Sequence, residues 1–222
     1  MWRDAVLVAG KDLRIEMRSR VALWQVLPVA VLSLVLYAFA LGPDRNVLSG
    51  AAPGLFWLAV LFSTVLATQR SFAIESPEGT RDALRSAGID PAGIFLGKAA
   101  AIAVELAALQ IVLFLAMTFL FGVHLRHVWL AVVACLIATV GLASAGTLYG
   151  ALSAGLRVRE TLLPLLVLPV LAPVLLSASR AWSGALSGTV AQGASWLRVL
   201  GPFAAVYLVI GVLLYGPLLE SG

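Results

Sequence analysis

Six stretches without a charged residue, each close to the thickness of a bilayer in helical length, constrain this chain more than any other feature. They are residues 21–43, 46–69, 106–123, 127–156, 161–179 and 199–219. A helix needs about 20 consecutive apolar residues to cross the hydrocarbon core. Because 61% of the 222 residues are hydrophobic and only 12% are charged, the chain has too little polar surface for a soluble domain. The sequence predicts an all-α polytopic membrane protein.

The pattern predicts one transmembrane domain over residues 1–222 with six spans. We expect the spans at about 21–41, 54–70, 98–121, 128–152, 162–178 and 200–219. A further uncharged stretch, residues 181–197, reads AWSGALSGTVAQGASWL. Its polar side chains would each need a partner inside the bundle. We therefore expect this stretch to be interfacial or re-entrant.

Residues 1–20 carry apolar side chains at helical spacing, with charged residues between them. The apolar positions are Trp2, Val6, Ala9, Leu13 and Met17. Such a pattern is typical of an amphipathic helix in the headgroup plane, with its arginines facing water and anionic lipid. The simpler interpretation is a membrane anchor, and the alternative is an elbow helix that also touches a cytoplasmic partner.

The basic residues indicate the orientation. Eleven of the 15 lysines and arginines lie in residues 1–20, 70–98 and 153–160. The other four lie in the alternate connections, 42–53, 122–127 and 179–198. Positively charged connections favour the cytoplasmic side, so both termini are expected there. The net charge of +4 thus reflects topology, and without a soluble basic domain we expect no nucleic-acid partner.

Few residues could support catalysis or metal binding. Cys135 is the single cysteine, so no paired-cysteine metal site or heme-attachment motif can be written. Ser144 lies deep in the span 128–152, whereas His124 and His127 precede its start. A nucleophile and a base at such different depths cannot act together. We therefore expect no catalytic residue and no metal site.

One acid, Glu105, falls inside a predicted span. It lies seven residues after Lys98, or about 10 Å further along the helix. An ionisable residue within the membrane is by default a candidate functional residue. The alternative is an ion pair between Glu105 and Lys98 near the cytoplasmic surface. Small residues in the span 128–152, among them Gly141, Gly146 and Gly150, predict close helix packing.

The segment ESPEGTRDALRSAGIDP, residues 75–91, predicts a short helix over 75–88 between the second and third spans. Ser76 suits the N-cap, Pro77 the first helical position and Gly88 the C-terminal cap. A helix this short is not stable alone, so another surface must pack on it. Its mixed charges favour a protein partner over lipid, which attracts basic clusters.

Residues 41–99 resemble the heme exporter protein B family (CcmB), permeases of the cytochrome c maturation system. The matching positions are Gly42-Pro43, Ala52-Pro53-Gly54 with Trp57, Arg70, Phe72, the stretch Glu75–Leu84, and Lys98. Leu166-Val167-Leu168-Pro169 and Pro173 resemble the family as well. The six-span plan and charged N-terminal helix extend the similarity over nearly the whole chain, although the last 40 or so residues match only in pattern.

The resemblance implies an ABC-2-type permease of the bacterial cytoplasmic (inner) membrane. In such permeases the helix at 75–88 is a coupling helix that docks on a separate ATP-binding subunit. The implied docking residues are Glu75, Glu78, Gly79, Thr80, Arg81 and Leu84. The chain has no G-x-x-x-x-G-K-[ST] phosphate loop, so we expect a non-enzymatic subunit and ATP on the partner.

The resemblance also implies a set of partners. They are an ABC ATP-binding subunit (CcmA-like), a heme-handling membrane protein (CcmC-like), a small accessory membrane subunit (CcmD-like), a periplasmic heme chaperone (CcmE-like) and a second copy of this chain. Heme is the implied substrate of the complex. His124 and His127 are candidate heme or chaperone contacts, since histidine ligates heme iron; the alternative is two polar residues in an interfacial turn. The alternative function is an ABC-2-type exporter permease for a lipid, glycan or drug.

The predicted topology can be tested with single cysteines at Ser76 and Ser187 in a Cys135→Ala background. An impermeant thiol reagent should label position 76 only from the cytoplasmic side and position 187 only from the outside, because three predicted spans lie between the two positions. Labelling of position 187 from the cytoplasmic side would contradict the six-span topology.

Overall fold

The computed structural model describes residues 1–19, 26–73, 90–153 and 159–220, which consist of helices joined by short connections. The helices are α1 (Trp2–Ser19), α2 (Leu27–Leu41), α3 (Arg45–Ala73), α5 (Pro91–Phe121), α6 (Val128–Ser153), α7 (Arg159–Ser187) and α8 (Val190–Glu220). No strand occurs in these ranges. The prediction of an all-α polytopic membrane protein is confirmed.

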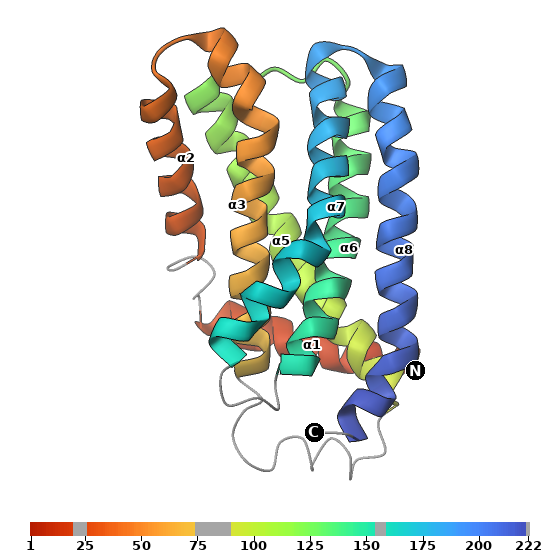
Figure 1. Ribbon diagram of the computed structural model, residues 1–222. Coiled ribbons are helices and arrows are strands. Elements are labelled where there is room, and N and C mark those ends of the chain that lie inside the picture. Colours follow the sequence, from red (N-terminus) through yellow and green to blue (C-terminus); the bar gives the residue numbers. More distant parts are fainter. Residues whose placement is uncertain (20–25, 74–89, 154–158, 221–222) are drawn as a thin grey trace.

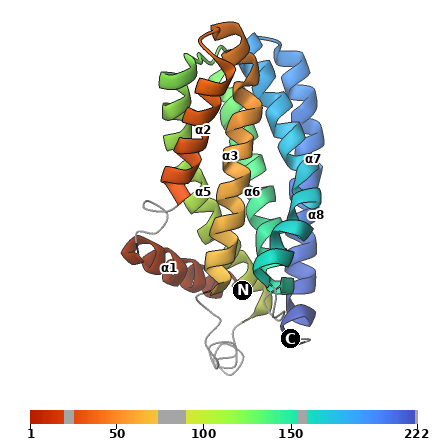
Figure 2. The same ribbon diagram turned by 60° about the vertical axis from the view of Figure 1, so that its left-hand side comes forward.

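Six of these helices form an upright bundle, and α1 lies across one end of it (Figures 1 and 2). We call this end, which also holds the N-terminus and the end of α8, the α1 end. The connections α2–α3, α5–α6 and α7–α8 lie at the opposite end (Figure 1). The predicted helix over 75–88 lies outside the described residues.

Five of the described helices are long and apolar enough to cross a membrane. They cover Arg45–Ala73, Pro91–Phe121, Val128–Leu152, Val167–Ser187 and Val190–Leu218. Helix α2 is apolar but has only 15 residues, or about 22 Å, against a hydrocarbon core of about 30 Å. Every predicted span thus has a helix, although several helices extend beyond the predicted limits.

The start of α3 differs most from its prediction. The expected span begins at 54, after Ala52-Pro53-Gly54, but the helix begins at Arg45 and contains Pro53. A carboxylate oxygen of Asp44 accepts a hydrogen bond from the Asn46 N–H at 2.8 Å, which compensates a free donor at the helix start. Proline removes one hydrogen bond from a helix, and the bonds on either side of Pro53 carry the helix through.

Residues 181–197, expected to be interfacial or re-entrant, form a helical turn at the end of the bundle: α7 continues to Ser187 and α8 begins at Val190. The Trp182 indole N–H donates to the Ala131 carbonyl of α6 at 3.3 Å, whereas two serines find partners close in sequence. Ser183 donates to the Ser179 carbonyl at 3.0 Å, and Ser195 donates to the Gln192 carbonyl at 2.7 Å. Gly188 makes the turn with a φ of 84°.

The predicted close packing along α6 is confirmed. A Cβ on Gly141 would lie 3.3 Å from Cα of Ala204 in α8, and one on Gly150 would lie 2.9 Å from Cγ2 of Thr68 in α3. A Cβ on Gly146 would meet Thr68 as well. Gly141 thus brings α6 close to the α8 backbone, and Gly146 and Gly150 make room for side chains of α3.

Glycines also dock α1 onto α5. A Cβ on Gly97 would lie 2.7 Å from the Ala5 carbonyl oxygen and 2.7 Å from Cβ of Val8. A Cβ on Gly93 would lie 2.9 Å from Cβ of Asp4. Helix α1 therefore packs directly on protein along one side, in addition to any contact that it makes with lipid headgroups.

Substitution of Gly97 by alanine should separate α1 from α5 and destabilise the protein by about 1–3 kcal/mol, since backbone must shift to admit the methyl group. Gly10→Ala is the matched control: no atom lies within 4 Å of a Cβ there, and alanine is the better helix former by about 1 kcal/mol. Thermal unfolding of the detergent-solubilised variants measures both effects. Unfolding of Gly97→Ala at or above the wild-type temperature would contradict the close contact.

Candidate functional site

A charged cluster lies where α1 crosses α3 and α5, and we call it the charged junction. Its members are Asp12 and Glu16 of α1, Arg70 of α3, and Lys98 and Glu105 of α5. All five side chains are largely or fully buried. Charged groups enter a protein interior only when a partner compensates them. The junction is therefore held by its ion pairs.

Arg70 bridges the two other helices of the junction. Its Nη2 bonds to Oε2 of Glu16, and its Nη1 lies 3.5 Å from Oε1 of Glu105. A guanidinium has five donors in a rigid plane, so it can serve two carboxylates at once. One side chain of α3 thus fixes positions on both α1 and α5.

Lys98 makes the second cross-helix link and has no exposed side-chain surface. Its Nζ lies 3.2 Å from Oδ2 of Asp12 and 3.5 Å from Oγ of Ser71. It also lies 5.0 Å from the centre of the Phe72 ring, within the range of a cation–π contact. A buried ammonium with these neighbours is compensated from both α1 and α3.

A small cavity of about 30 Å³ borders the junction and is large enough for one water molecule. Asp12, Glu16, Ser71 and Glu105 contribute to its wall. Within the described part of the chain, Oε1 of Glu105 and Nη1 of Arg70 are buried without a hydrogen bond. Their compensation is therefore mainly electrostatic, which leaves the Glu105 carboxylate less firmly held than that of Glu16.

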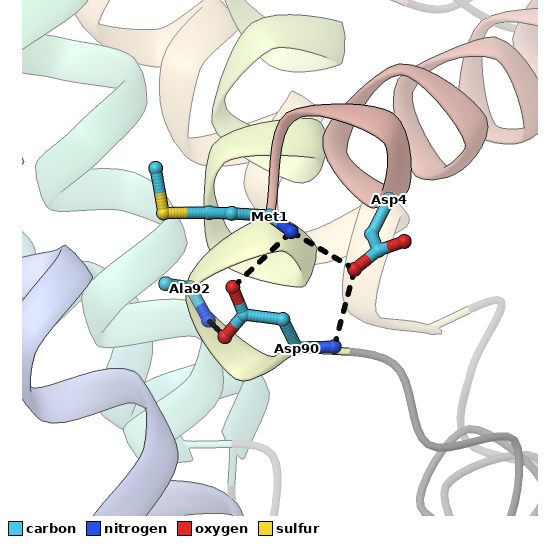
Figure 3. Close-up of polar contacts among 4 residues, drawn as sticks. All are labelled: Met1, Asp4, Asp90 and Ala92. Atoms are coloured by element: carbon cyan, nitrogen blue, oxygen red, sulfur yellow. Dashed lines mark hydrogen bonds and ion pairs between the residues drawn. The ribbon is translucent and has the colours of Figure 1, made fainter.

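A separate set of polar contacts joins the other end of α1 to the start of α5 (Figure 3). Oδ2 of Asp4 accepts from the backbone N–H of Asp90 at 3.4 Å and from the Met1 ammonium at 3.2 Å. The hydrogen bond from that ammonium lowers the pKa of Asp4 and raises the pKa of the amino group. Oδ1 of Asp90 caps α5 by accepting from the Ala92 N–H at 3.2 Å.

Helix α1 therefore contacts the chain on both sides of segment 74–89. At one end it holds Arg70, three residues before α3 ends, and at the other it holds Asp90, directly before α5 begins. Figure 1 shows α1 running across this end of the bundle, and Figure 2 shows that it extends outward on one side. Helix α1 thus connects the end of α3 with the start of α5, the two helices that border residues 74–89.

The structure places the predicted intramembrane candidates, Glu105 and Lys98, together in the junction. Their ion pairs run to other helices, to Arg70 and Asp12 respectively, where the alternative had paired them with each other. The sequence reasoning did not assign Asp12, Glu16 or Arg70 to a site. A signal was present: Asp12 and Glu16 are four residues apart, on one helix face.

The other predicted site residues lie elsewhere. The six docking candidates, Glu75, Glu78, Gly79, Thr80, Arg81 and Leu84, are outside the described residues. His124 and His127 lie at the opposite end of the bundle from the junction. Nδ1 of His124 is 2.8 Å from the Gly122 carbonyl oxygen, and the backbone N–H of His127 donates to Ala185 at 3.2 Å.

The exposed His124 side chain borders a pocket of about 340 Å³ at that end. Ser49 of α3 and Ser183 and Ser187 of α7 also line it. No group of three His, Cys, Asp or Glu side chains suited to a metal ion occurs among the described residues. The arrangement fits a polar turn that ties α5–α6 to α7, and it places both histidines far from the charged junction.

A larger cavity of about 520 Å³ opens between α5 and α6. Its polar members, Gln110 and Thr139, bond to each other at 2.8 Å, and Thr139 donates to the Cys135 carbonyl. Exposed apolar residues such as Ile111 and Leu136 form its rim. The cavity thus presents an apolar surface that matches lipid hydrocarbon.

The chain is similar to known proteins of one family over most of its length. The family model described as CcmB protein matches residues 3–218. Heme exporter protein B of Rhodobacter capsulatus is 31% identical over 198 residues, 88% of this chain and 86% of the relative. The protein of the same name from Haemophilus influenzae is 30% identical over 78% of each chain, and that from Pseudomonas aeruginosa is 26% identical over 89% of each.

Loss of Arg70 should destabilise the protein more than loss of the charge on its partner Glu105. Arg70→Gln should destabilise the protein by about 3–5 kcal/mol, because it leaves Glu16 and Glu105 as uncompensated neighbouring charges. Glu105→Gln should have a smaller effect, because Arg70 keeps Glu16 and the amide is nearly isosteric. Chemical unfolding in detergent compares the two, and Lys11→Gln serves as a control at a more exposed pair. Equal destabilisation by Arg70→Gln and Lys11→Gln would contradict the bridging role of Arg70.

Proposed function

The chain belongs to the CcmB family, and from this membership we propose that it is the membrane permease subunit of an ABC transporter complex for cytochrome c biogenesis. Relatives over most of the chain carry the name Heme exporter protein B. The complex delivers heme or releases a heme-loaded chaperone, and a separate subunit hydrolyses ATP. The family match over residues 3–218 is the observation that carries this proposal.

In this proposal the protein resides in the bacterial inner membrane with its α1 end in the cytoplasm. The excess of lysine and arginine in residues 1–20, 70–98 and 153–160 supports this orientation. Segment 74–89 then faces the cytoplasm, where an ATP-binding subunit can reach it. The opposite end, with His124 and His127, faces the periplasm and its heme chaperone.

Coupling in this proposal runs from the ATP-binding subunit to residues 75–88 and from there into α3 and α5. These two helices border the segment, and both are fixed to α1 through Arg70 and Lys98. A force on the segment is therefore shared by three helices. Glu105 adds an ion pair to Arg70 at the point where α3 and α5 meet. Its role is to keep these helices in register, so it acts as a positioning residue.

The remaining partners follow from the same proposal. The complex contains a heme-handling membrane protein, a small accessory membrane subunit and a second copy of this chain. Heme is the substrate of the complex, and no residue of this chain is assigned to bind it.

Deletion of the gene tests the proposed function. Loss of covalently bound heme from c-type cytochromes, with recovery when the wild-type gene is returned, is the expected result. Copurification of the chain with an ATP-binding subunit and a heme-handling membrane protein is expected as well. Normal cytochrome c maturation in the deletion strain would contradict the proposal and would favour an exporter of another substrate.

Substitution within 75–88 separates docking from coupling. Leu84→Asp should abolish copurification of the ATP-binding subunit, because a charge in an apolar contact is costly and truncation of a central contact removes about 2 kcal/mol or more. Glu78→Ala removes a charge worth about 0.3–1 kcal/mol at a helix end, so the subunit should remain bound while cytochrome c maturation falls. Wild-type copurification with Leu84→Asp would exclude this segment as the docking site.

A further inference from the structure

The acidic residues of α1 face the rest of the protein, and its arginines face outward. Each of its three acids is engaged in contacts with the protein: Asp4 with Asp90, Asp12 with Lys98, and Glu16 with Arg70. Its three arginines, Arg3, Arg14 and Arg18, are exposed, and Lys11 is paired with Asp12. The outward side of α1 therefore carries three exposed arginines, and the acid that adjoins them, Asp4, is already engaged by Asp90 and the Met1 ammonium.

Large apolar side chains lie beside these arginines. Trp2 is 73% exposed, Val6 71% and Met17 74%. At 100° per residue they form one stripe along the helix, next to the stripe of Arg3, Arg14 and Arg18. We call these six residues together the outward face of α1. A solvent-facing helix would not display such a stripe, whereas a helix in the headgroup region has lipid on that side and water beyond.

The position of α1 in the fold fits this environment. Helix α1 lies across the bundle at the level where the upright helices end (Figures 1 and 2). Arg70, at its buried side, comes directly after the charge-free run 46–69. The end of a charge-free run is expected near the membrane surface, where the phosphate groups of lipids lie. The exposed arginines and the adjoining apolar stripe therefore match an anionic lipid, with its phosphate and its acyl chain, in both charge and polarity.

We propose that the outward face of α1 is a binding surface for anionic phospholipids, and that its occupancy regulates the transporter through the charged junction. The regulatory step has a defined route. Lipid bound on one side of α1 sets the position of the helix in the headgroup plane. The ion pairs on its other side carry that position to α3 and α5, which border segment 74–89.

Binding can be measured on the full chain alone, in neutral detergent, by titration with phosphatidylglycerol and phosphatidylcholine. Phosphatidylglycerol should raise the unfolding temperature at lower concentration than phosphatidylcholine, and added salt should weaken its effect. In the triple variant Arg3→Gln/Arg14→Gln/Arg18→Gln, the midpoint for phosphatidylglycerol should rise by about fivefold per arginine removed. The matched control is Arg126→Gln/Arg180→Gln/Arg198→Gln, which removes three exposed arginines from the opposite end.

Two outcomes would overturn the binding surface. One is an equal change of the midpoint in the two triple variants. The other is a shift by inorganic phosphate at the concentrations at which phosphatidylglycerol acts, which would indicate a site for free phosphate. The salt dependence is measured on the wild-type chain, so the test does not depend on the folding of a variant.

The regulatory step rests on the proposed function and needs a second measurement. The complex with its ATP-binding subunit is reconstituted in vesicles of phosphatidylcholine, with or without phosphatidylglycerol. ATP hydrolysis should depend on phosphatidylglycerol severalfold more in the wild type than in the α1 triple variant, with the opposite-end variant like the wild type. Equal lipid dependence in all three would overturn the regulatory step. If the chain alone gives the expected lipid titration but no ATP-binding subunit associates with it, the result would instead contradict the proposed function.

Discussion

The buried charge of Arg70 is the interaction on which the arrangement of the α1 end depends. An apolar bundle can contain ionised groups only if opposite charges reach them from neighbouring helices. Arg70 meets this condition with Glu16 of α1 and Glu105 of α5, and Lys98 meets it with Asp12. The requirement therefore decides where α1 lies, how it is rotated and at which level α3 and α5 stand beside each other. Glycines at 93 and 97 then admit the α1 backbone to the place that the charges select.

The two ends of the bundle are held by different kinds of contact. At the α1 end, side-chain ion pairs connect helices that are distant in sequence. At the opposite end, backbone N–H groups of Arg126 and His127 bond to the Ala185 carbonyl, and Gly184 meets Gly193 at the α7–α8 turn. Backbone contacts between glycines leave little freedom for relative movement. At the α1 end the buried ion pairs must be kept, so a displacement of α1 is passed on to α3 and α5.

Sequence reasoning predicted the helices well and the junction only in part. Runs without charge locate spans because lipid excludes charge, and this rule holds for α3, α5, α6 and α8. At residues 181–197 the polar side chains do not prevent helix formation, because serine can bond to the preceding turn of its own helix. Glu105 could be selected because it interrupts an apolar stretch. Its partner Arg70 could not be selected in this way. The ion pairs of Arg70 depend on how α1, α3 and α5 meet, which no local pattern encodes.

The sequence distance across the junction has a consequence for biogenesis. Asp12 and Lys98 are 86 positions apart, and Glu16 and Arg70 are 54 apart. At about 5–20 residues per second, a ribosome needs roughly 4–17 s to proceed from the first of these residues to the last. During that interval the acids of α1 face water or headgroups without their buried partners. The N-terminal helix is thus made first but reaches its final place only after α5 has entered the membrane.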